Sequence, residues 1–486
     1  MSIGLYIIIL GFISIIGINN KDIITSIWPK LVKQASLILS IISLYIILYW
    51  WYIYETNING YQLITNIYNI SLGLDSISLY LIILTGIIIP ISLLSNWNNI
   101  KNNNILRQSH EGKFNILILL LGIILLINYL AIDLLSFYIF FEASLIPLFI
   151  LIGIYGANNK EKAAYYVLIF TFTSSLFMLL SIVVTTYMIN TTSCLIYSQF
   201  ILSIDLQILL WIGIMLGILV KTPLFPFHVW LPVVHSESPL GGSIILAGLI
   251  LKLTVYLIIR WLLPFLAEAS IIFYPTVYII CILTIIYTSL TTLAQIDLKV
   301  IIAYSSISHM GVCIIGVFAN NIIGIEGSYL LSLSHGFISP GLFIAVGGIL
   351  YDRYHTRILM YYQGLLSFMP VFALYLLILS FANIGTPLSG NFIGEFLSLT
   401  GAFQRSPIFT TIASFSILLS ATYQMKLTSR LTGGIKSPYI KLTNDLTNRE
   451  SILMLSTILP CLLLGIYPIF IFKGLYANLS NVIYLF

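Results

Sequence analysis

Residues 221–260 read KTPLFPFHVWLPVVHSESPLGGSIILAGLILKLTVYLIIR, and this stretch decides the fold class. Two lysines, Lys221 and Lys252, are embedded in its apolar sequence. A charged side chain at the centre of a bilayer costs about 2.5–3.5 kcal/mol on insertion scales, so such residues normally face a bundle interior or a watery cavity. Pro223 and Pro226 follow Lys221 and lack backbone donors, which predicts a broken helix at this point.

The whole chain has the composition of a membrane protein. Of its 486 residues, 59% are hydrophobic and 8% are charged, whereas a soluble domain carries about 25% charged residues. The net charge of +5 is spread over the loops and forms no basic block that would indicate nucleic-acid binding. We therefore expect an all-α, polytopic integral membrane protein.

A membrane-spanning helix needs roughly 20 mainly apolar residues. By this criterion the sequence predicts fourteen spans, at residues 3–18, 35–54, 74–94, 114–131, 132–155, 163–190, 206–230, 241–262, 271–294, 299–318, 321–350, 369–400, 406–431 and 450–472. No Arg-rich presequence precedes the first segment, so we expect a retained span there rather than a removed signal. The boundary between the fourth and fifth spans, near Ala131, is the least clearly marked in the sequence.

The loop charges are consistent with this count and predict an orientation. The loops after odd-numbered spans hold fifteen lysines and arginines, whereas those after even-numbered spans hold only Arg260, Arg405 and Lys473. The positive-inside rule then places the odd loops on the cytoplasmic-type face and both termini on the other face. The three remaining basic residues, Lys221, Lys252 and Lys426, fall within apolar segments.

Six ionisable residues within apolar segments are candidates for a proton path. They are Glu142, Lys221, Lys252, His309, His335 and Glu395. The structural alternative is that each is an ion pair or a helix-end residue that reaches the interface. Six together favour function, because intramembrane charges mark ion pathways and proton relays. Lys426 and Asp133 lie near segment ends, where a structural role is equally compatible with their positions.

Three of the predicted spans, the seventh, eleventh and twelfth, contain prolines beside the candidate residues. Pro340 follows His335, and Pro387 precedes Glu395. Irregular backbone at membrane depth is tolerated where it is buried or lines water, so we expect broken helices here; a simple packing kink is the alternative. Lys221 and Glu395 are 174 residues apart, as are Lys252 and Lys426. This five-span offset predicts inverted repeats, which are typical of transporters.

Other chemistries lack their usual motifs. No Gly-rich dinucleotide fingerprint or P-loop occurs, so the chain should bind neither NADH nor ATP. The four cysteines are far apart and form no C-x-x-C motif, which argues against zinc and iron–sulfur sites. His228 and His235 fall in a predicted loop, and His309 and His335 lie on separate helices, which gives poor support for haem ligation.

The sequence resembles the antiporter-like membrane subunits of respiratory complex I. The resemblance rests on residues 221–260 and on four further segments in the family's order, FYIFFEASLIPLFILIGIYG (137–156), DLKVIIAYSSISHMG (297–311), SHGFISPGLFIAVGGILYDRYHTR (334–357) and NIGTPLSGNFIGEF (383–396). Thr254, Val255 and Leu257 stand where this family usually has glycines, which predicts tighter packing around Lys252.

The resemblance implies a division of the chain and a set of roles. It implies three N-terminal helices (1–113), inverted repeats of helices 4–8 (114–262) and 9–13 (271–431), and a last helix with its tail (450–486). Glu142 and Lys221 become a paired carboxylate and lysine. Lys252 becomes the central relay, His309 and His335 further relays, and Glu395 the terminal carboxylate.

The same resemblance implies a setting for the chain. It implies the mitochondrial inner membrane, with both termini in the intermembrane space. The expected partners are membrane lipids and other complex I membrane subunits, including antiporter-like neighbours on both sides. NADH, FMN, iron–sulfur clusters and ubiquinone are expected in partner subunits, with no cofactor and no metal in this chain. Two alternatives stay open: an independent Na⁺/H⁺ antiporter component, and a non-pumping scaffold or quinone-binding subunit.

Overall fold

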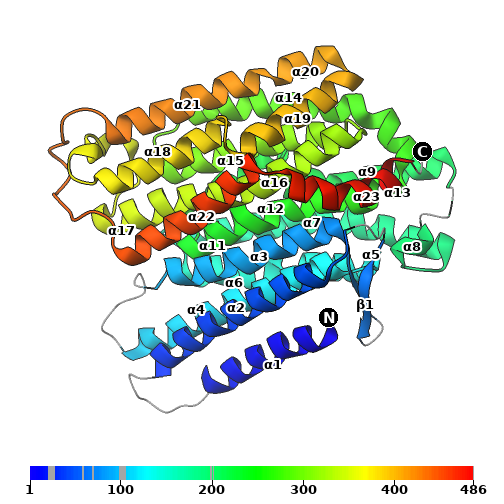
Figure 1. The fold of residues 1–486 in the computed structure, drawn as a ribbon, viewed down its shortest axis with the longest axis horizontal. Coiled ribbons are helices and arrows are strands. Elements are labelled where there is room, and N and C mark those ends of the chain that lie inside the picture. Colours follow the sequence, from blue (N-terminus) through cyan, green and yellow to red (C-terminus); the bar gives the residue numbers. More distant parts are fainter. Residues whose placement is uncertain are drawn as a thin grey trace.

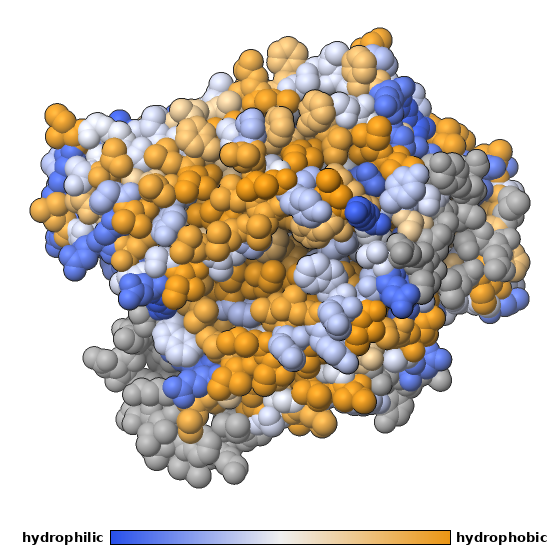
Figure 2. Space-filling model, viewed as in Figure 1, coloured by the Kyte–Doolittle hydropathy of each residue, from blue (hydrophilic) through white to orange (hydrophobic). Residues whose placement is uncertain are grey.

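The computed structural model describes residues 1–19, 28–56, 60–67, 70–97, 105–197, 200 and 202–484. Its long helices run roughly side by side, with α1 (Ser2–Asn19) along one edge and α20 (Pro407–Ala413) and α21 (Phe415–Thr432) along the opposite edge (Figure 1). Apolar residues cover most of the face in Figure 2, and hydrophilic residues gather mainly towards the two ends of the helices. This distribution fits a body that crosses a bilayer along its helix axes.

The first half of the chain comprises thirteen α-helices and one hairpin within the described residues. After α1 come α2 (Trp28–Ile53), β1 (Gln62–Ile67), β2 (Ile70–Leu74), α3 (Ser76–Ser95), α4 (Ile105–Leu130), α5 (Leu134–Ala143), α6 (Leu145–Tyr155), α7 (Lys160–Ile189), α8 (Cys194–Tyr197), α9 (Ile204–Lys221), η1 (Phe227–Val229), α10 (Trp230–Glu237), α11 (Leu240–Ile245), η2 (Leu246–Ile250), α12 (Leu251–Leu257), η3 (Ile258–Leu262) and α13 (Leu263–Phe265).

In the described part of the second half, all of the regular secondary-structure elements are helices. They are α14 (Ala267–Ala294), α15 (Leu298–Val317), α16 (Ile322–Phe343), η4 (Ile344–Leu350), α17 (Tyr351–Tyr354), η5 (Leu359–Tyr361), η6 (Leu365–Ser367), α18 (Pro370–Ile384), α19 (Gly390–Arg405), α20, α21, α22 (Asn448–Ile466) and α23 (Ile469–Tyr484). Segments η1, η5 and η6 are 3₁₀ turns, whereas η2, η3 and η4 are π-helical.

Twelve helical segments of the described chain are long and apolar enough to cross a membrane. Two shorter apolar helices, Ile3–Ile16 and Pro370–Ile384, lie where the first and twelfth spans are predicted. The chain is therefore a multi-pass membrane protein. The predicted join near Ala131 is a true interruption, because α4 ends at Leu130 and α5 begins at Leu134.

A short antiparallel hairpin is the exception to the all-α prediction. Strands β1 and β2 pair between α2 and α3. The carboxylate of Asp133 accepts hydrogen bonds from the backbone N–H and the hydroxyl of Ser71, at 3.2 and 2.5 Å. Asp133 therefore fastens the hairpin to the start of α5, which is a structural role.

Two of the three predicted helix breaks are present at the expected prolines. Helix α9 ends at Lys221, immediately before Pro223, and the chain continues through η1 into α10. The twelfth predicted span is divided into α18 and α19, with Gly385 in the left-handed region at φ +81° and the hydroxyl of Ser389 capping α19. Glycine suits that backbone because it has no Cβ to clash.

The expectation that Pro340 breaks the eleventh span was wrong. Helix α16 continues through Pro340 to Phe343, and the irregular backbone follows it as η4. Pro340 removes one hydrogen bond only, and the surrounding helices bury α16 tightly enough to hold it. A Cβ added at Gly336 would lie 3.2 Å from the carbonyl oxygen of Gly248, so η2 and α16 approach closely at glycines.

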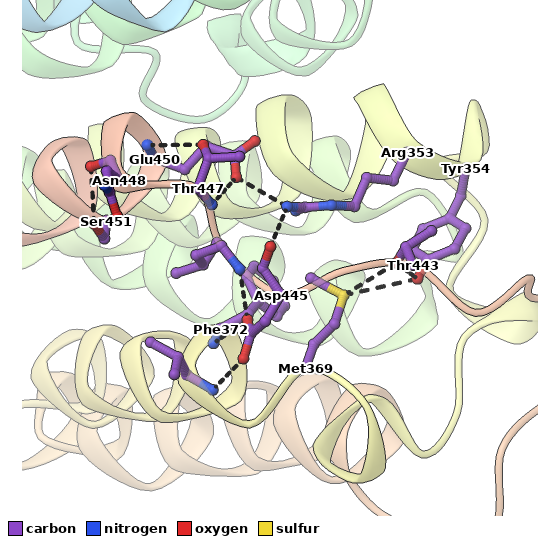
Figure 3. Close-up of polar contacts among 12 residues, drawn as sticks. Arg353, Tyr354, Met369, Phe372, Thr443, Asp445, Thr447, Asn448, Glu450 and Ser451 are labelled. Atoms are coloured by element: carbon purple, nitrogen blue, oxygen red, sulfur yellow. Dashed lines mark hydrogen bonds and ion pairs between the residues drawn. The ribbon is translucent and has the colours of Figure 1, made fainter.

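The loop between α21 and α22 is fixed by a polar cluster, shown in Figure 3. The carboxylate of Asp445 accepts from the backbone N–H groups of Val371 and Phe372 in the first turn of α18, at 2.8 and 3.2 Å. Arg353, in α17, donates to the carbonyl of Asp445 and pairs with Glu450 at 2.9 Å. A carboxylate at a helix N-terminus satisfies amides that lack helical partners, so this cluster ties three spans together at one end.

Candidate functional site

Lys221 and Glu142 form a partly buried ion pair between α9 and α5. The Lys221 side chain is 2% exposed, and its Nζ lies 3.4 Å from Oε1 of Glu142. Nζ also donates to the carbonyl of Phe141 at 3.0 Å and lies over the Phe141 ring. The carboxylate contact is longer than the 2.7–2.9 Å typical of a strong charge-assisted bond. The carbonyl of Phe141 is therefore the closer partner of the ammonium group.

Lys221 meets the C-terminal end of α5. That helix ends at Ala143, and the carbonyl of Phe141 in its last turn accepts from Lys221. Lys221 is the last residue of α9. A cation is stabilised there because the C-terminal end of a helix carries partial negative charge.

Lys252 contacts His335 in the middle of the molecule. The lysine is fully buried, and its Nζ lies 3.1 Å from Nδ1 of His335. Nζ also donates to the carbonyl of Ala247 at 2.5 Å. The backbone N–H of Leu251 donates to Leu246 in the π-helical manner, rather than to Ala247. Because of the π-helical turn, the carbonyl of Ala247 is free to accept a hydrogen bond from the ammonium group of Lys252.

Thr254, Val255 and Leu257 are all essentially buried. They lie in α12, the short α-helical segment between η2 and η3. Lys252 is thus held in a segment that is closely packed on all sides.

His309 continues the contacts from His335 to Glu395. The rings of His335 and His309 are 5.3 Å apart between centroids, and Nδ1 of His309 lies 2.8 Å from Oε1 of Glu395. All three side chains are buried. The Nε2 atoms of both histidines are buried without a hydrogen-bond partner among the described residues. Lys252, His335, His309 and Glu395 therefore form a connected row of acids and bases.

The structure brings the six predicted residues together in two groups. One is the Glu142–Lys221 pair and the other is the row from Lys252 to Glu395. Within the described residues, no direct side-chain contact joins Lys221 to Lys252. Charge in apolar segments pointed to the residues, and the family resemblance implied that Glu142 pairs with Lys221; the direct contacts of Lys252 with His335 and of His309 with Glu395 come from the structure.

The prediction that His228 and His235 lie in a loop was wrong. Both are buried, in η1 and α10, and the ring of His235 stacks on Phe343 at 4.6 Å. Burial, with the positive charges of Lys299 and Lys252, lowers the pKa of His235 to about 3. Burial and the two nearby lysines thus both disfavour the protonated form of His235. Helix α10 is too short for a membrane span, so the span criterion left it in a loop.

A polar cavity of about 700 Å³ opens beside this histidine. It lies where the ends of α6 and α10 meet the starts of α15 and α17, and its lining includes Glu237, Lys299 and Arg357. Lys299 is 6% exposed and donates to the carbonyl of Ser238 at 3.1 Å. The cavity lies at the end of the molecule where the odd-numbered loops were predicted, and its lining begins one residue after His235, at Ser236.

One buried ion pair was missed at the sequence level. Arg260, counted there as a loop charge, lies in η3 and pairs with Asp75 at 3.0 Å. The guanidinium also stacks over the ring of Tyr61 at 4.1 Å. Asp75 caps α3 through the backbone N–H of Ser78, and an acidic residue just before an apolar run is the pattern that could have indicated it.

A membrane-helix bundle with a buried row of acids and bases is the architecture of an ion-translocating membrane protein. Residues 131–420 match the family model described as NADH:quinone oxidoreductase/Mrp antiporter, TM. The chain belongs to this family, as an antiporter-like membrane subunit of the respiratory complex I type.

Individual relatives agree with this assignment. NADH-ubiquinone oxidoreductase chain 4 of Wickerhamomyces canadensis is 52% identical over 99% of this chain and 98% of its own length. Chain 4 of Candida albicans is 57% identical over 85% of this chain and 87% of its own.

A solved structure has the same fold. A chain of respiratory complex I from Thermus thermophilus with bound NADH superposes with a TM-score of 0.88 at 27% sequence identity. The match covers 99% of each chain. The arrangement of helices is therefore shared along the whole length.

Proposed function

We propose that the chain is a proton-translocating membrane subunit of NADH:ubiquinone oxidoreductase, and that Glu142, Lys221, Lys252, His309, His335 and Glu395 carry the protons. The observation that carries this proposal is the row from Lys252 through His335 and His309 to Glu395, in which hydrogen-bond-distance contacts form both ends and the two histidine rings lie 5.3 Å apart in between. Each neighbouring pair can share or pass a proton, either directly or through one water between the histidine rings. The redox chemistry belongs to partner subunits, where NADH, FMN, iron–sulfur clusters and ubiquinone are expected.

The Glu142–Lys221 pair acts as the gate of this row. Dry surroundings destabilise an ammonium ion, and a nearby carboxylate stabilises it. Lys221 therefore holds its proton while Glu142 is close and releases it when the pair separates. Redox work elsewhere in the assembly moves Glu142 or a neighbouring charge, and the proton passes toward Lys252. Two states of the pair are required, because a static pair shifts no equilibrium.

The fold is proposed to comprise fourteen membrane crossings with two inverted repeats, helices 4–8 and 9–13. The twelve long apolar segments and the two shorter helices support the count. The breaks after Lys221 and after Ile384 support the repeat, because they fall in spans that correspond under the five-span offset. The implied divisions at 1–113, 114–262, 271–431 and 450–486 follow from it.

The proposed setting is the mitochondrial inner membrane, with both termini in the intermembrane space and antiporter-like subunits on either side. The orientation rests on the excess of basic residues in the odd-numbered loops. On this orientation the cavity at Lys299 opens to the matrix, which suits proton uptake toward His235 and Lys252.

Substitution of the gate in the assembled complex tests the proposal. Lys221→Ala and Glu142→Gln should each lower NADH-driven proton translocation by roughly tenfold or more, because a positioned proton-transfer group is removed. Glu161→Gln is the matched control, since Glu161 is an exposed carboxylate in the first turn of α7. Full pumping by both gate variants, in vesicles containing normally assembled complex, contradicts the proposal.

The two alternatives give different results. An independent Na⁺/H⁺ antiporter component would show ion flux from the purified chain without an electron donor. A non-pumping scaffold or quinone-binding subunit would keep unaltered coupling after Lys252 and Glu395 are changed. The high identity to chain 4 proteins over nearly the full length favours the complex I role.

A further inference from the structure

Lys426 is the third lysine that falls within an apolar segment of the sequence, and the proposed proton path does not include it. It lies on α21, and its exposed side chain donates from Nζ to the carbonyl of Leu293, in the last turn of α14, at 2.5 Å. Arg430 lies one turn further along α21, is also exposed, and donates to the carbonyl of Met360 at 3.5 Å. Residues four apart share a helix face, so both cations point to the same side.

These two cations border a recess of about 510 Å³ on the surface. Its walls come from α21, from the turn around Met360 and Gln363, and from Gly433 and Gly434. Among the described residues that line the recess there is no carboxylate, so no acidic side chain of its lining neutralises the two positive charges. A lysine ammonium has three donors and a guanidinium five. Each cation can therefore donate both to its backbone carbonyl and to a bound anion.

The position of the recess points to a lipid. It lies at the C-terminal ends of α14 and α21, which pack side by side in Figure 1. The outward faces of these helices expose large apolar side chains, including Leu283 and Leu290 on α14 and Leu418 and Met425 on α21. An amphiphile with its phosphate at Lys426 and Arg430 would lay its acyl chains along these faces.

We propose that this recess binds the phosphate headgroup of an anionic membrane phospholipid. The two cations hold the phosphate oxygens, and the apolar faces of α14 and α21 hold the chains. Basic pockets between membrane helices are known to receive anionic headgroups, and each Lys or Arg near the surface contributes roughly 1 kcal/mol to binding. The lipid also screens the repulsion between Lys426 and Arg430 and strengthens the contact of α21 with α14.

Photo-crosslinking in the intact complex tests the site. The complex is reconstituted in vesicles of phosphatidylcholine that contain either photoactivatable phosphatidylglycerol or photoactivatable phosphatidylcholine. Phosphatidylglycerol should label peptides from α21 and from the 359–363 turn, and the double variant Lys426→Gln/Arg430→Gln should lower that labelling by roughly tenfold. Lys441→Gln is the matched control: it removes an exposed charge from the following loop, and Lys441 is not in the recess.

Additional conditions in the same crosslinking experiment distinguish between the possible ligands of the recess. Excess inorganic phosphate should leave the labelling unchanged, and its loss would indicate a free-anion site and overturn the lipid assignment. Equal labelling by phosphatidylcholine, or no labelling of the native chain because a partner subunit covers the recess, would also overturn it. If the double variant assembles poorly, Arg430→Gln alone should lower labelling, and Lys426→Arg should preserve it because the charge is kept.

Discussion

Nδ1 of His309 lies 2.8 Å from Oε1 of Glu395, although 86 residues separate them in the chain. The contact joins α15 to α19, and it stands at the end of the row that begins at Lys252. A histidine and a carboxylate at this distance can share one proton in a hydrogen bond, so the two side chains can act as a unit.

Single removal of either partner should therefore disable this end of the row. His309→Gln and Glu395→Gln should each lower the number of protons moved per NADH oxidised, and the double variant should be no worse than the more impaired single variant, because residues that act as a unit are not additive. Proton uptake and NADH oxidation measured together in vesicles check this. Additive losses would mean that the two residues act in separate paths.

Replacing Lys252 by arginine separates proton transfer from charge. Arginine keeps a positive charge beside His335 but does not deprotonate in proteins. Lys252→Arg should therefore remove proton translocation while the complex still assembles, as should Lys252→Met. If Lys252 only balances charge, the arginine variant will pump normally while the methionine variant fails. The amount of assembled complex is measured first, because Lys252 is completely buried and packing could suffer.

Gly385 supports Glu395 through its backbone. It has φ +81°, and a Cβ there would lie 3.0 Å from Oε2 of Glu395. Gly385→Ala should lower stability by about 1–3 kcal/mol through backbone strain, and it should also impair translocation by displacing the carboxylate. Gly153→Ala is the matched control, since a Cβ at Gly153 meets nothing within 4 Å. Equal thermal stability and equal pumping of the two variants would contradict this role.

The Asp75–Arg260 pair should be structural. Breaking a buried ion pair by removing one partner costs about 3–5 kcal/mol, because the other charge is left uncompensated. Asp75→Asn and Arg260→Met should each lower the thermal stability of the assembled complex, and the double variant should recover part of the loss. The proton-to-electron ratio of the complex that survives should be unchanged. A change in that ratio would place the pair in the proton path instead.

Particular residues show how far sequence inspection reached. Lys221 and Lys252 stood out because charge in apolar sequence is costly, and Pro223 correctly marked the end of α9. The helix break predicted at Pro340 was wrong, because one missing hydrogen bond does not end a helix that is buried on all sides. His235 was misplaced in a loop, because the eight-residue helix α10 is too short to meet the length criterion for a span, and hydropathy does not register that other helices cover it.

The sequence by itself determined that this chain is a membrane protein. It also determined which ionisable residues lie within apolar segments and to which family the chain belongs. Those properties are set by local composition, since the cost of burying charge in lipid acts residue by residue. Only the tertiary structure decided which acids meet which bases. Contacts such as Lys252 with His335 and His309 with Glu395 join residues more than eighty positions apart, and packing between helices brings them within hydrogen-bond distance.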